Sequence, residues 1–150
     1  MTILLSDTRT PASTTQFSFE RIVGFGDCDP AGIVYFPNYY LMLHETFEAW
    51  WRHLGIPLPN LINERRIGTP TAHLETDFVA PSRFGETLRF RLAVEKLGTT
   101  SLILRHVADS EGIDRVRMRQ RIVATSLQTH RPLAWPADVH SAIVNFMRST

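Results

Sequence analysis

A series of extended segments separated by short turns places the strongest limit on the fold of this chain. Four segments are rich in β-branched, aromatic and alternating apolar side chains: residues 71–79, 87–97, 99–109 and 115–129. The turn residues between them are Pro81, Ser82, Gly85, Gly98, Glu111 and Gly112. Because these connections are too short for a helical crossover, the segments predict an antiparallel sheet.

The segment before this series has a helical period. From Asn38 onward, apolar residues recur at three- and four-residue steps, and charged residues take other positions. The apolar stripe consists of Tyr40, Leu43, Phe47, Trp50 or Trp51, and Leu54. Gly55 and Pro57 end this predicted helix, and a first strand over residues 16–25 precedes it.

Two further elements complete the predicted order. A short irregular or helical connection is expected over residues 59–66. A short C-terminal helix follows Trp135 and Pro136, with one apolar face made by Ala142, Ile143, Phe146 and Met147. One long helix followed by consecutive strands indicates an α+β domain in which the sheet buries the aromatic stripe. We expect a flexible tail over residues 1–15 and one domain over residues 16–150.

Composition narrows the class of protein. The hydrophobic content of 43% over 150 residues suits one domain with its own core, and the formal charge of +1 gives no field that would attract nucleic acid or a membrane surface. Cys28 stands alone, so no intramolecular disulfide forms, and a reducing, cytoplasmic compartment is expected. Neither a signal peptide nor a membrane-spanning run is expected.

Residues 26–36, which we call the acidic turn, are the first candidates for a catalytic role. Asp27 and Asp29 precede the long helix, Pro30 favours an extended Asp29, and Gly32 allows a sharp bend. Such a turn can direct a carboxylate at a polarised carbonyl. The alternatives are a solvated turn or a calcium loop. An EF-hand fails on spacing, because its third acidic position and its closing glutamate would fall on Ala31 and Asn38.

The sequence from Gly26 to Tyr39, GDCDPAGIVYFPNY, resembles the signature of the 4-hydroxybenzoyl-CoA thioesterase family of hot-dog-fold acyl-CoA thioesterases. Residues 67–70, Ser101 and the pair Arg105-His106 support the resemblance. It implies an antiparallel sheet wrapped around a long central helix. It also implies homodimers that assemble into homotetramers, with active sites at the dimer interface.

The same resemblance assigns roles by position. Asp29 matches the catalytic carboxylate, which attacks the thioester carbonyl or activates water. Phe36 matches the residue whose backbone N–H polarises that carbonyl, and Thr69 matches a pocket position that places the substrate. The remaining substrate-binding candidates in the turn are Gly32, Val34 and Tyr35. Asp27 is expected to be structural.

Two further residues near the motif, His44 and Cys28, have more than one possible role. His44 occupies a helix position where related enzymes often carry an acidic residue, and here Glu45 carries the charge instead. It either assists proton transfer or is a hydrogen-bonded structural histidine. Cys28 lies between two carboxylates, which raise a thiol pKa, so we expect a buried small side chain and not a nucleophile. The other histidines show no metal-ligand spacing, and neither a metal nor a prosthetic group is expected.

Four arginines alternate along one predicted strand: Arg115, Arg117, Arg119 and Arg121. Alternation places their side chains on one face of the sheet. Because arginine binds phosphate oxygens bidentately, one hypothesis is that Arg117 and Arg119 hold the nucleotide end of coenzyme A. The alternative is a solvated or interface face paired with acidic residues.

The resemblance implies an acyl-CoA thioesterase that releases a free acid and coenzyme A, with an aromatic acyl group. The aromatic helix is mostly core, and one or two rings near its N-terminus are candidates for an acyl pocket. Two alternatives remain: a hot-dog dehydratase or isomerase acting on acyl thioesters, and a protein that binds acyl-CoA without turnover.

Overall fold

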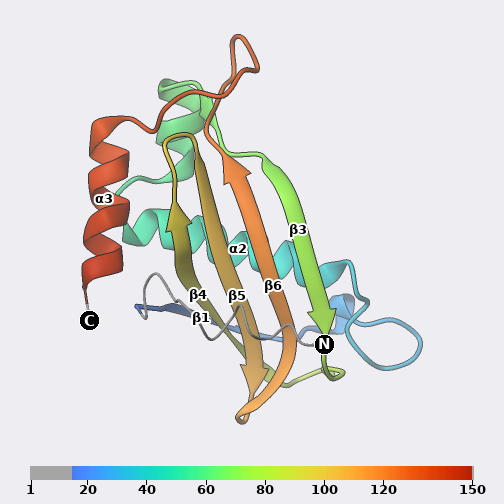
Figure 1. Ribbon diagram of the computed structural model, residues 1–150. Coiled ribbons are helices and arrows are strands. Elements are labelled where there is room, and N and C mark those ends of the chain that lie inside the picture. The colour runs from blue at the N-terminus through green and yellow to red at the C-terminus, as the bar shows by residue number, and fades with distance from the viewer. Residues whose placement is uncertain (1–14, 150) are drawn as a thin grey trace.

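The computed structural model describes residues 15–149, so nearly all of the predicted tail lies outside the described residues. A five-stranded antiparallel sheet has the order β1-β4-β5-β6-β3, and helix α2 crosses one face of it (Figure 1). The main elements are β1 (Phe17–Ile22), α2 (Asn38–His53), β3 (Thr71–Phe78), β4 (Thr87–Leu97), β5 (Ser101–Ser110) and β6 (Ile113–Val123). The predicted α+β class and antiparallel pairing are therefore confirmed.

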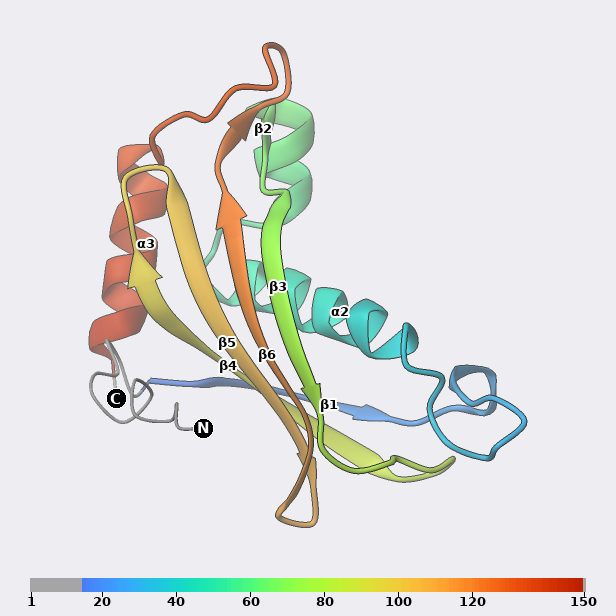
Figure 2. The same ribbon diagram turned by 45° about the vertical axis from the view of Figure 1, so that its right-hand side comes forward.

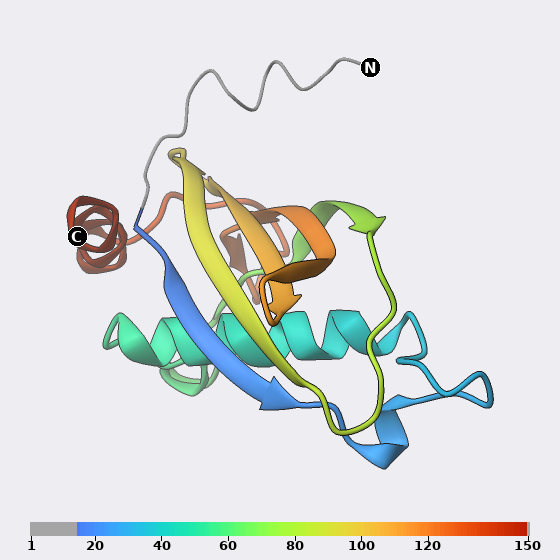
Figure 3. The ribbon, with the colours of Figure 1, turned by 90° about the horizontal axis from the view of Figure 1, so that it is seen from below.

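Smaller elements lie outside the five-stranded sheet. They are η1 (Phe25–Asp27), η2 (Asn60–Glu64), β2 (Ile67–Gly68), β7 (Thr125–Ser126) and α3 (Ala137–Arg148). The sheet curls around α2, and α3 stands beside it at the end opposite the acidic turn (Figures 2 and 3). Helix α3 confirms the C-terminal helix expected after Trp135 and Pro136.

Two strand ends differ from the prediction by three residues or more. The last long strand ends at Val123 and does not continue to residue 129. Ala124 N–H donates to Thr100 O over 2.7 Å, and the chain then pairs with β2 as the short strand β7. The first strand ends at Ile22 and not at residue 25, because η1 begins directly after Gly24. At the end of the last long strand, a hydrogen bond to a distant segment thus ends a pattern that local alternation would extend.

Helix α2 has nearly the bounds that the sequence predicts. It follows Pro37, whose φ of −62° suits a helix start, and the chain leaves it through Gly55 at φ +83°. The buried stripe is shifted from the prediction, since Tyr39 is buried and Tyr40 only partly so. The buried residues of α2 are Tyr39, Met42, Leu43, Thr46, Phe47, Ala49, Trp50 and Trp51.

The core consists of two clusters along α2. The closed cluster surrounds Trp50 and Trp51, and its other members include Phe47, Leu92, Val94, Leu102, Leu104, Ile122, Trp135, Val139, Ile143 and Phe146. The open cluster lies nearer the helix start and contains Val23, Val34, Tyr39, Met42, Leu43, Leu88, Phe90, Ala108, Val116 and Met118. Helix α3 covers the closed cluster only, because its buried residues all belong to that cluster.

Strand β3 is an edge of the sheet, bonded on one side to β6. Seven of its eight residues are exposed. Leu74 and Phe78 keep 36% and 49% of their surface, and Val79 just beyond the strand keeps 44%. An edge that combines free backbone groups with apolar side chains is suited to pairing with another chain.

Candidate active site

The acidic turn folds as a small antiparallel hairpin directly before α2. Asp29 N–H donates to Ile33 O over 3.0 Å, and Tyr35 N–H donates to Asp27 O over 2.9 Å. Gly32 sits at the tip with φ +84°, a conformation that a side chain would strain. The hairpin therefore holds Asp29 on one limb and leads into the helix start on the other.

Asp27 is fixed by the chain around it. Arg21 donates to both of its carboxylate oxygens over 2.7 and 3.2 Å, and Gly24 N–H donates to Oδ2 over 2.7 Å. The hydrogen bond from Arg21 holds the pKa of the Asp27 carboxyl below its usual value. Arg21 Nε also lies 2.7 Å from Glu45 of α2. Asp27 thus ties β1, the turn and the helix together, which is a structural role.

Asp29 is half-buried and accepts fewer hydrogen bonds than Asp27. Its Oδ1 accepts the N–H of Ala31 over 2.8 Å, which orients the side chain within the turn. Its Oδ2 accepts no hydrogen bond from any residue between 15 and 149. One oxygen of Asp29 is therefore held by the chain, and the other is available to a reacting group.

The backbone N–H of Phe36 is also available. The amides two residues before and after it are bonded. Val34 N–H donates to Ser82 O and Asn38 N–H donates to Tyr35 O, each over 2.8 Å. Across the described part of the chain, Phe36 N–H has no acceptor. It lies at the start of α2, where the helix dipole favours negative charge. This amide can therefore donate to an oxygen that gains charge during a reaction.

An apolar hollow of about 360 Å³ opens beside this amide. It is lined by Ile33, Val34, Phe36, Tyr39, Phe78, Val79, Ala80 and Pro81. The Phe78 ring centroid lies 5.9 Å from that of Phe36 and 6.0 Å from that of Tyr39. Aromatic walls of this kind suit a flat ring. Sequence reasoning anticipated rings near the helix start but missed Phe78, which a gap of about forty residues separates from them.

Within one chain, Thr69 and His44 lie far from the acidic turn and the apolar hollow. Thr69 precedes β3, whereas Phe78 meets Phe36 at the far end of that strand. At about 3.3 Å per residue, Thr69 lies roughly 25–30 Å from the hollow. His44 is exposed on α2, about 12 Å along the helix from Phe36. Its Nε2 lies 3.3 Å from Glu48 Oε2. Their predicted roles remain predictions.

The arginine row is divided between two environments. Arg117 and Arg119 lie on the face of the sheet away from α2, where Arg117 pairs with Asp114 at 2.9 Å and Arg119 with Glu95 at 2.7 Å. Arg115 is wrongly grouped with them, because it is 7% exposed. It donates to Pro81 O over 2.7 Å and to Glu86 over 2.9 Å. The β3–β4 loop covers it, which alternation alone could not predict. The phosphate role of Arg117 and Arg119 remains a prediction.

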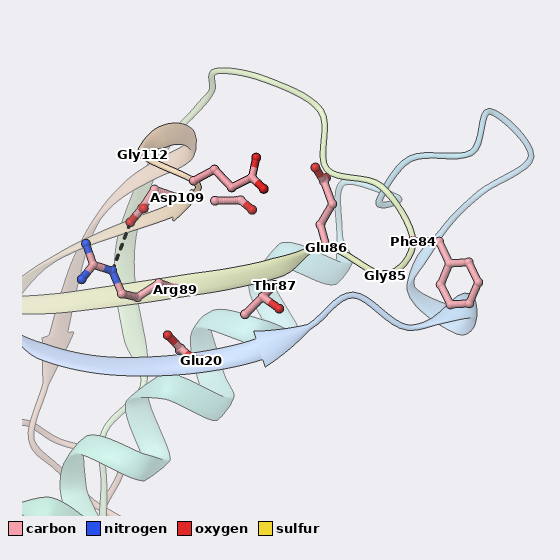
Figure 4. A pocket seen from close by; sticks show the side chains of 10 residues that line it. Glu20, Phe84, Gly85, Glu86, Thr87, Arg89, Asp109 and Gly112 are labelled. Carbon is pink, nitrogen blue, oxygen red and sulfur yellow. Dashed lines mark ion pairs between the residues drawn. The ribbon is translucent and has the colours of Figure 1, made fainter.

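A second, larger hollow of about 790 Å³ lies between the β3–β4 loop and the β5–β6 turn, beside the end of β1 (Figure 4). Its lining includes the carboxylates of Glu20, Glu86, Asp109 and Glu111. Arg89 Nε reaches Asp109 Oδ1 at 3.6 Å, and Phe84 stands at the rim (Figure 4). Because carboxylates dominate its wall, this hollow is unsuited to the anionic phosphates of a coenzyme A substrate.

Comparison with known proteins identifies the family. The profile of the Thioesterase-like superfamily matches residues 23–143. The chain belongs to this superfamily. The match covers the acidic turn, α2 and every strand of the sheet except β1, and it confirms the resemblance seen in the sequence.

Three similar proteins extend this result. A 1,4-dihydroxy-2-naphthoyl-CoA hydrolase from Synechococcus elongatus is 30% identical over 126 residues, covering 83% of this chain and 79% of that protein. The structure of 4-hydroxybenzoyl-CoA thioesterase from Pseudomonas sp. strain CBS-3 has a TM-score of 0.78 at 25% identity, over 86% of this chain and 99% of that one. BH1999 gentisyl-coenzyme A thioesterase gives 0.78 at 29% identity, over 85% and 99%. The hot-dog prediction is thereby confirmed.

Metal clusters and membrane-spanning helices are both missing from the described residues. Residues 15–149 contain no grouping of three or more histidine, cysteine, aspartate or glutamate side chains that could hold a metal ion. Over the same residues, no helix has the length and hydropathy needed to span a bilayer. The absence of a cofactor and the cytoplasmic location remain predictions.

Proposed function

We propose that this protein is an acyl-CoA thioesterase that hydrolyses an aromatic acyl-CoA to the free acid and coenzyme A. The observation that carries the proposal is the unbonded Phe36 amide at the helix start, on the same hairpin as an Asp29 oxygen that is also unbonded. Three similar proteins are named for the hydrolysis of aromatic CoA thioesters, which supports the same substrate class here.

The chemistry needs few groups. Phe36 N–H binds the thioester oxygen as it gains negative charge. Asp29 then acts in one of two ways: its carboxylate attacks the carbonyl carbon, or it accepts a proton from a water that attacks. In either route the C–S bond breaks and the thiolate leaves as coenzyme A. In the first, water next cleaves the acyl-aspartyl anhydride and restores Asp29. Since a thiolate is a good leaving group, no strong acid is required.

The apolar hollow supports an aromatic acyl group. Phe36 and Phe78 supply ring faces, while Tyr39 is the one phenol in the lining and its hydroxyl turns to Ser82. A wall with so few polar atoms favours a planar apolar group over a charged one. The acyl group would then lie beside the amide that polarises its carbonyl.

A second copy of the chain would complete the site. Exposed β3 would pair antiparallel with β3 of a twofold-related copy and bury Leu74 and Phe78. Antiparallel pairing sets the Thr71 end of one strand beside the Phe78 end of the other. Thr69 of the second copy would thereby approach the hollow that Thr69 of the same chain cannot reach. The proposed homodimer, and its assembly into a homotetramer, can be measured by light scattering.

The central experiment replaces Asp29 by asparagine. The variant keeps the hydrogen bond from Ala31 through its side-chain oxygen but loses the charge, so it should fold normally. We expect kcat with 4-hydroxybenzoyl-CoA and other aromatic acyl-CoAs to fall by at least about 10³-fold. Asp138→Asn, at an exposed carboxylate of α3, is the matched control and should retain wild-type turnover.

Retained hydrolysis in Asp29→Asn would falsify the assignment. The assay follows free thiol, which hydrolysis releases and a dehydratase or isomerase does not. If an acyl-CoA raises the melting temperature of the wild type but no thiol is released, the protein binds acyl-CoA without turnover. Single-turnover hydrolysis in H₂¹⁸O separates the two routes, because label enters the Asp29 carboxylate only if the aspartate attacks the carbonyl.

A further inference from the structure

One residue of the β3–β4 loop (residues 79–86) contacts both flanks of the segment that carries the Phe36 amide. Ser82 accepts the Val34 N–H at its carbonyl oxygen over 2.8 Å. Its hydroxyl oxygen accepts the Tyr39 hydroxyl over 2.9 Å. Val34 lies two residues before Phe36 and Tyr39 lies three residues after it. The amide is therefore held between two hydrogen bonds that end on the same residue.

Both partners of the hydroxyl bond are buried. Ser82 is 0% exposed and Tyr39 is 4% exposed. Burial raises the pKa of the Tyr39 phenol, so the hydroxyl remains protonated and can donate at neutral pH. In such surroundings, a hydroxyl that loses its partner has no water to replace it. The bond is thus a strong constraint on the first turn of α2.

The loop that carries Ser82 is itself fixed to the sheet. Pro81 directly precedes Ser82, and its carbonyl oxygen accepts a hydrogen bond over 2.7 Å from the side chain of Arg115 on β6. The backbone oxygen of Arg115 accepts the N–H groups of Val79 and Ala80 over 2.8 and 3.2 Å. Its guanidinium also bonds both carboxylate oxygens of Glu86, at the far end of the loop. Ser82 is therefore a rigid support and not part of a mobile loop.

We infer that Ser82 is a positioning residue for the thioester reaction and that its bond to Tyr39 sets the direction of the Phe36 N–H. This inference rests on the proposed function. Ser82 does not touch the substrate: Tyr39 and Val34 line the apolar hollow, and Ser82 lies behind them. Its contribution comes through the amide, which must point to where the oxygen of the transition state will lie.

The inference has a kinetic signature. An amide that is displaced slightly still admits the acyl group to the hollow, so substrate binding changes little. Its bond to the developing oxyanion is made only in the transition state, so kcat carries the loss. A residue that only supported the fold would instead lower thermal stability and leave kcat of the folded protein unchanged.

The experiment compares Ser82→Ala, Tyr39→Phe and the double variant in a thermodynamic cycle. Each single variant removes one partner of the same bond and keeps the backbone bond from Val34. We expect kcat to fall roughly tenfold in each single variant and no further in the double, with KM within about threefold of wild type. Thr46→Val is the matched control, because it removes a buried hydroxyl of α2 that bonds only Met42 O. It should keep wild-type kcat.

A second measurement does not depend on turnover. In an amide-labelled NMR spectrum, the Phe36 N–H signal should shift in Ser82→Ala and in Tyr39→Phe but not in Thr46→Val. Unchanged kcat, additive losses in the double variant, or an unmoved Phe36 signal would each overturn the inference. If the wild type hydrolyses no acyl-CoA, the proposed function fails, and the Phe36 signal still decides whether Ser82 positions the amide.

Discussion

The two ends of α2 differ in how far one chain completes them. Around Trp50 and Trp51, both 0% exposed, the sheet and α3 cover the apolar side of the helix. Around the helix start, Phe36 remains 55% exposed, and Phe78 on the opposite strand 49%. The core is thus covered at one end of the helix. The other end exposes aromatic rings next to the unbonded Phe36 amide and the unbonded oxygen of Asp29.

This difference separates stability from chemistry along one helix. The closed cluster holds α2 through burial, which contributes about 25 cal/mol per Å² of apolar surface. The open end leaves part of its apolar surface uncovered, and uncovered apolar surface next to polar donors is what a substrate or a second chain can bury. Substitutions at the two ends should therefore affect different measurements.

The largest effect is expected at the closed end. Trp50→Ala leaves a cavity among Phe47, Trp51 and Phe146, and we expect it to lower the free energy of unfolding by about 3–5 kcal/mol. Phe36→Ala should cost less than about 1 kcal/mol, because its ring is half exposed, and should raise KM for an aromatic acyl-CoA. Urea unfolding and steady-state kinetics measure both. Equal losses of stability at the two ends would contradict the comparison.

Trp50→Phe refines the first result. The indole Nε1 of Trp50 is buried without a hydrogen-bond partner in the described structure, so phenylalanine removes an unsatisfied donor as well as volume. We expect this variant to be markedly more stable than Trp50→Ala. If both variants lose the same free energy, filled volume is not what makes the closed end stable.

The next effect concerns pH. His106 lies on β5 between Leu104 of the closed cluster and Ala108 of the open one, and burial lowers its pKa to about 4. The unfolded chain, with an ordinary histidine pKa near 6.5, binds the proton more readily. Stability should therefore fall as the pH drops from about 6.5 towards 4, by up to about 3 kcal/mol. His106→Gln should abolish this part of the pH dependence in urea titrations, and an unchanged slope would contradict the assignment.

A smaller effect tests whether the open end is covered by a second copy. Leu74→Glu places a charge on the exposed edge strand, where it costs little in a single chain but would be buried in the proposed dimer. We expect the dissociation constant to rise at least tenfold, or about 1.4 kcal/mol. Ile113→Glu, at an exposed hairpin position away from β3, serves as the control. If light scattering shows that the wild type is a monomer, the proposed homodimer is wrong.

The smallest effect is expected on the outer face of the sheet. Arg117 is exposed and already paired with Asp114, so its replacement by alanine should raise KM for an acyl-CoA by less than about threefold. A larger increase that weakens at high salt would instead show that Arg117 holds a phosphate. Arg131→Ala, at an exposed position of the β7 side, controls for loss of a surface charge.

The predictable part of the fold was local in the sequence. The period of α2, its end at Gly55 and the turns between strands are each set by residues within a few positions, so pattern alone indicated them. The end of β6 at Val123 was not predictable, because Thr100 from another hairpin accepts the next amide. Local alternation carries no information about such a partner.

The site followed the same rule. The acidic turn and the helix start are contiguous, so the resemblance to the family signature predicted roles for Asp29 and Phe36 together. Ser82 was missed, because it meets Tyr39 across 43 residues and reads in the sequence as an ordinary turn residue. Arg115 was misgrouped because alternation predicts a face of the sheet, not the loop that covers it.

The position of α3 has a practical consequence for handling the protein. Its last described residues lie beside the closed cluster, at the end of the molecule away from the acidic turn (Figure 1). An affinity tag, a fluorophore or a surface linkage attached after this helix would leave substrate entry and strand β3 unobstructed. The C-terminal side is therefore the attachment point of choice for immobilised assays and for single-molecule counting of subunits.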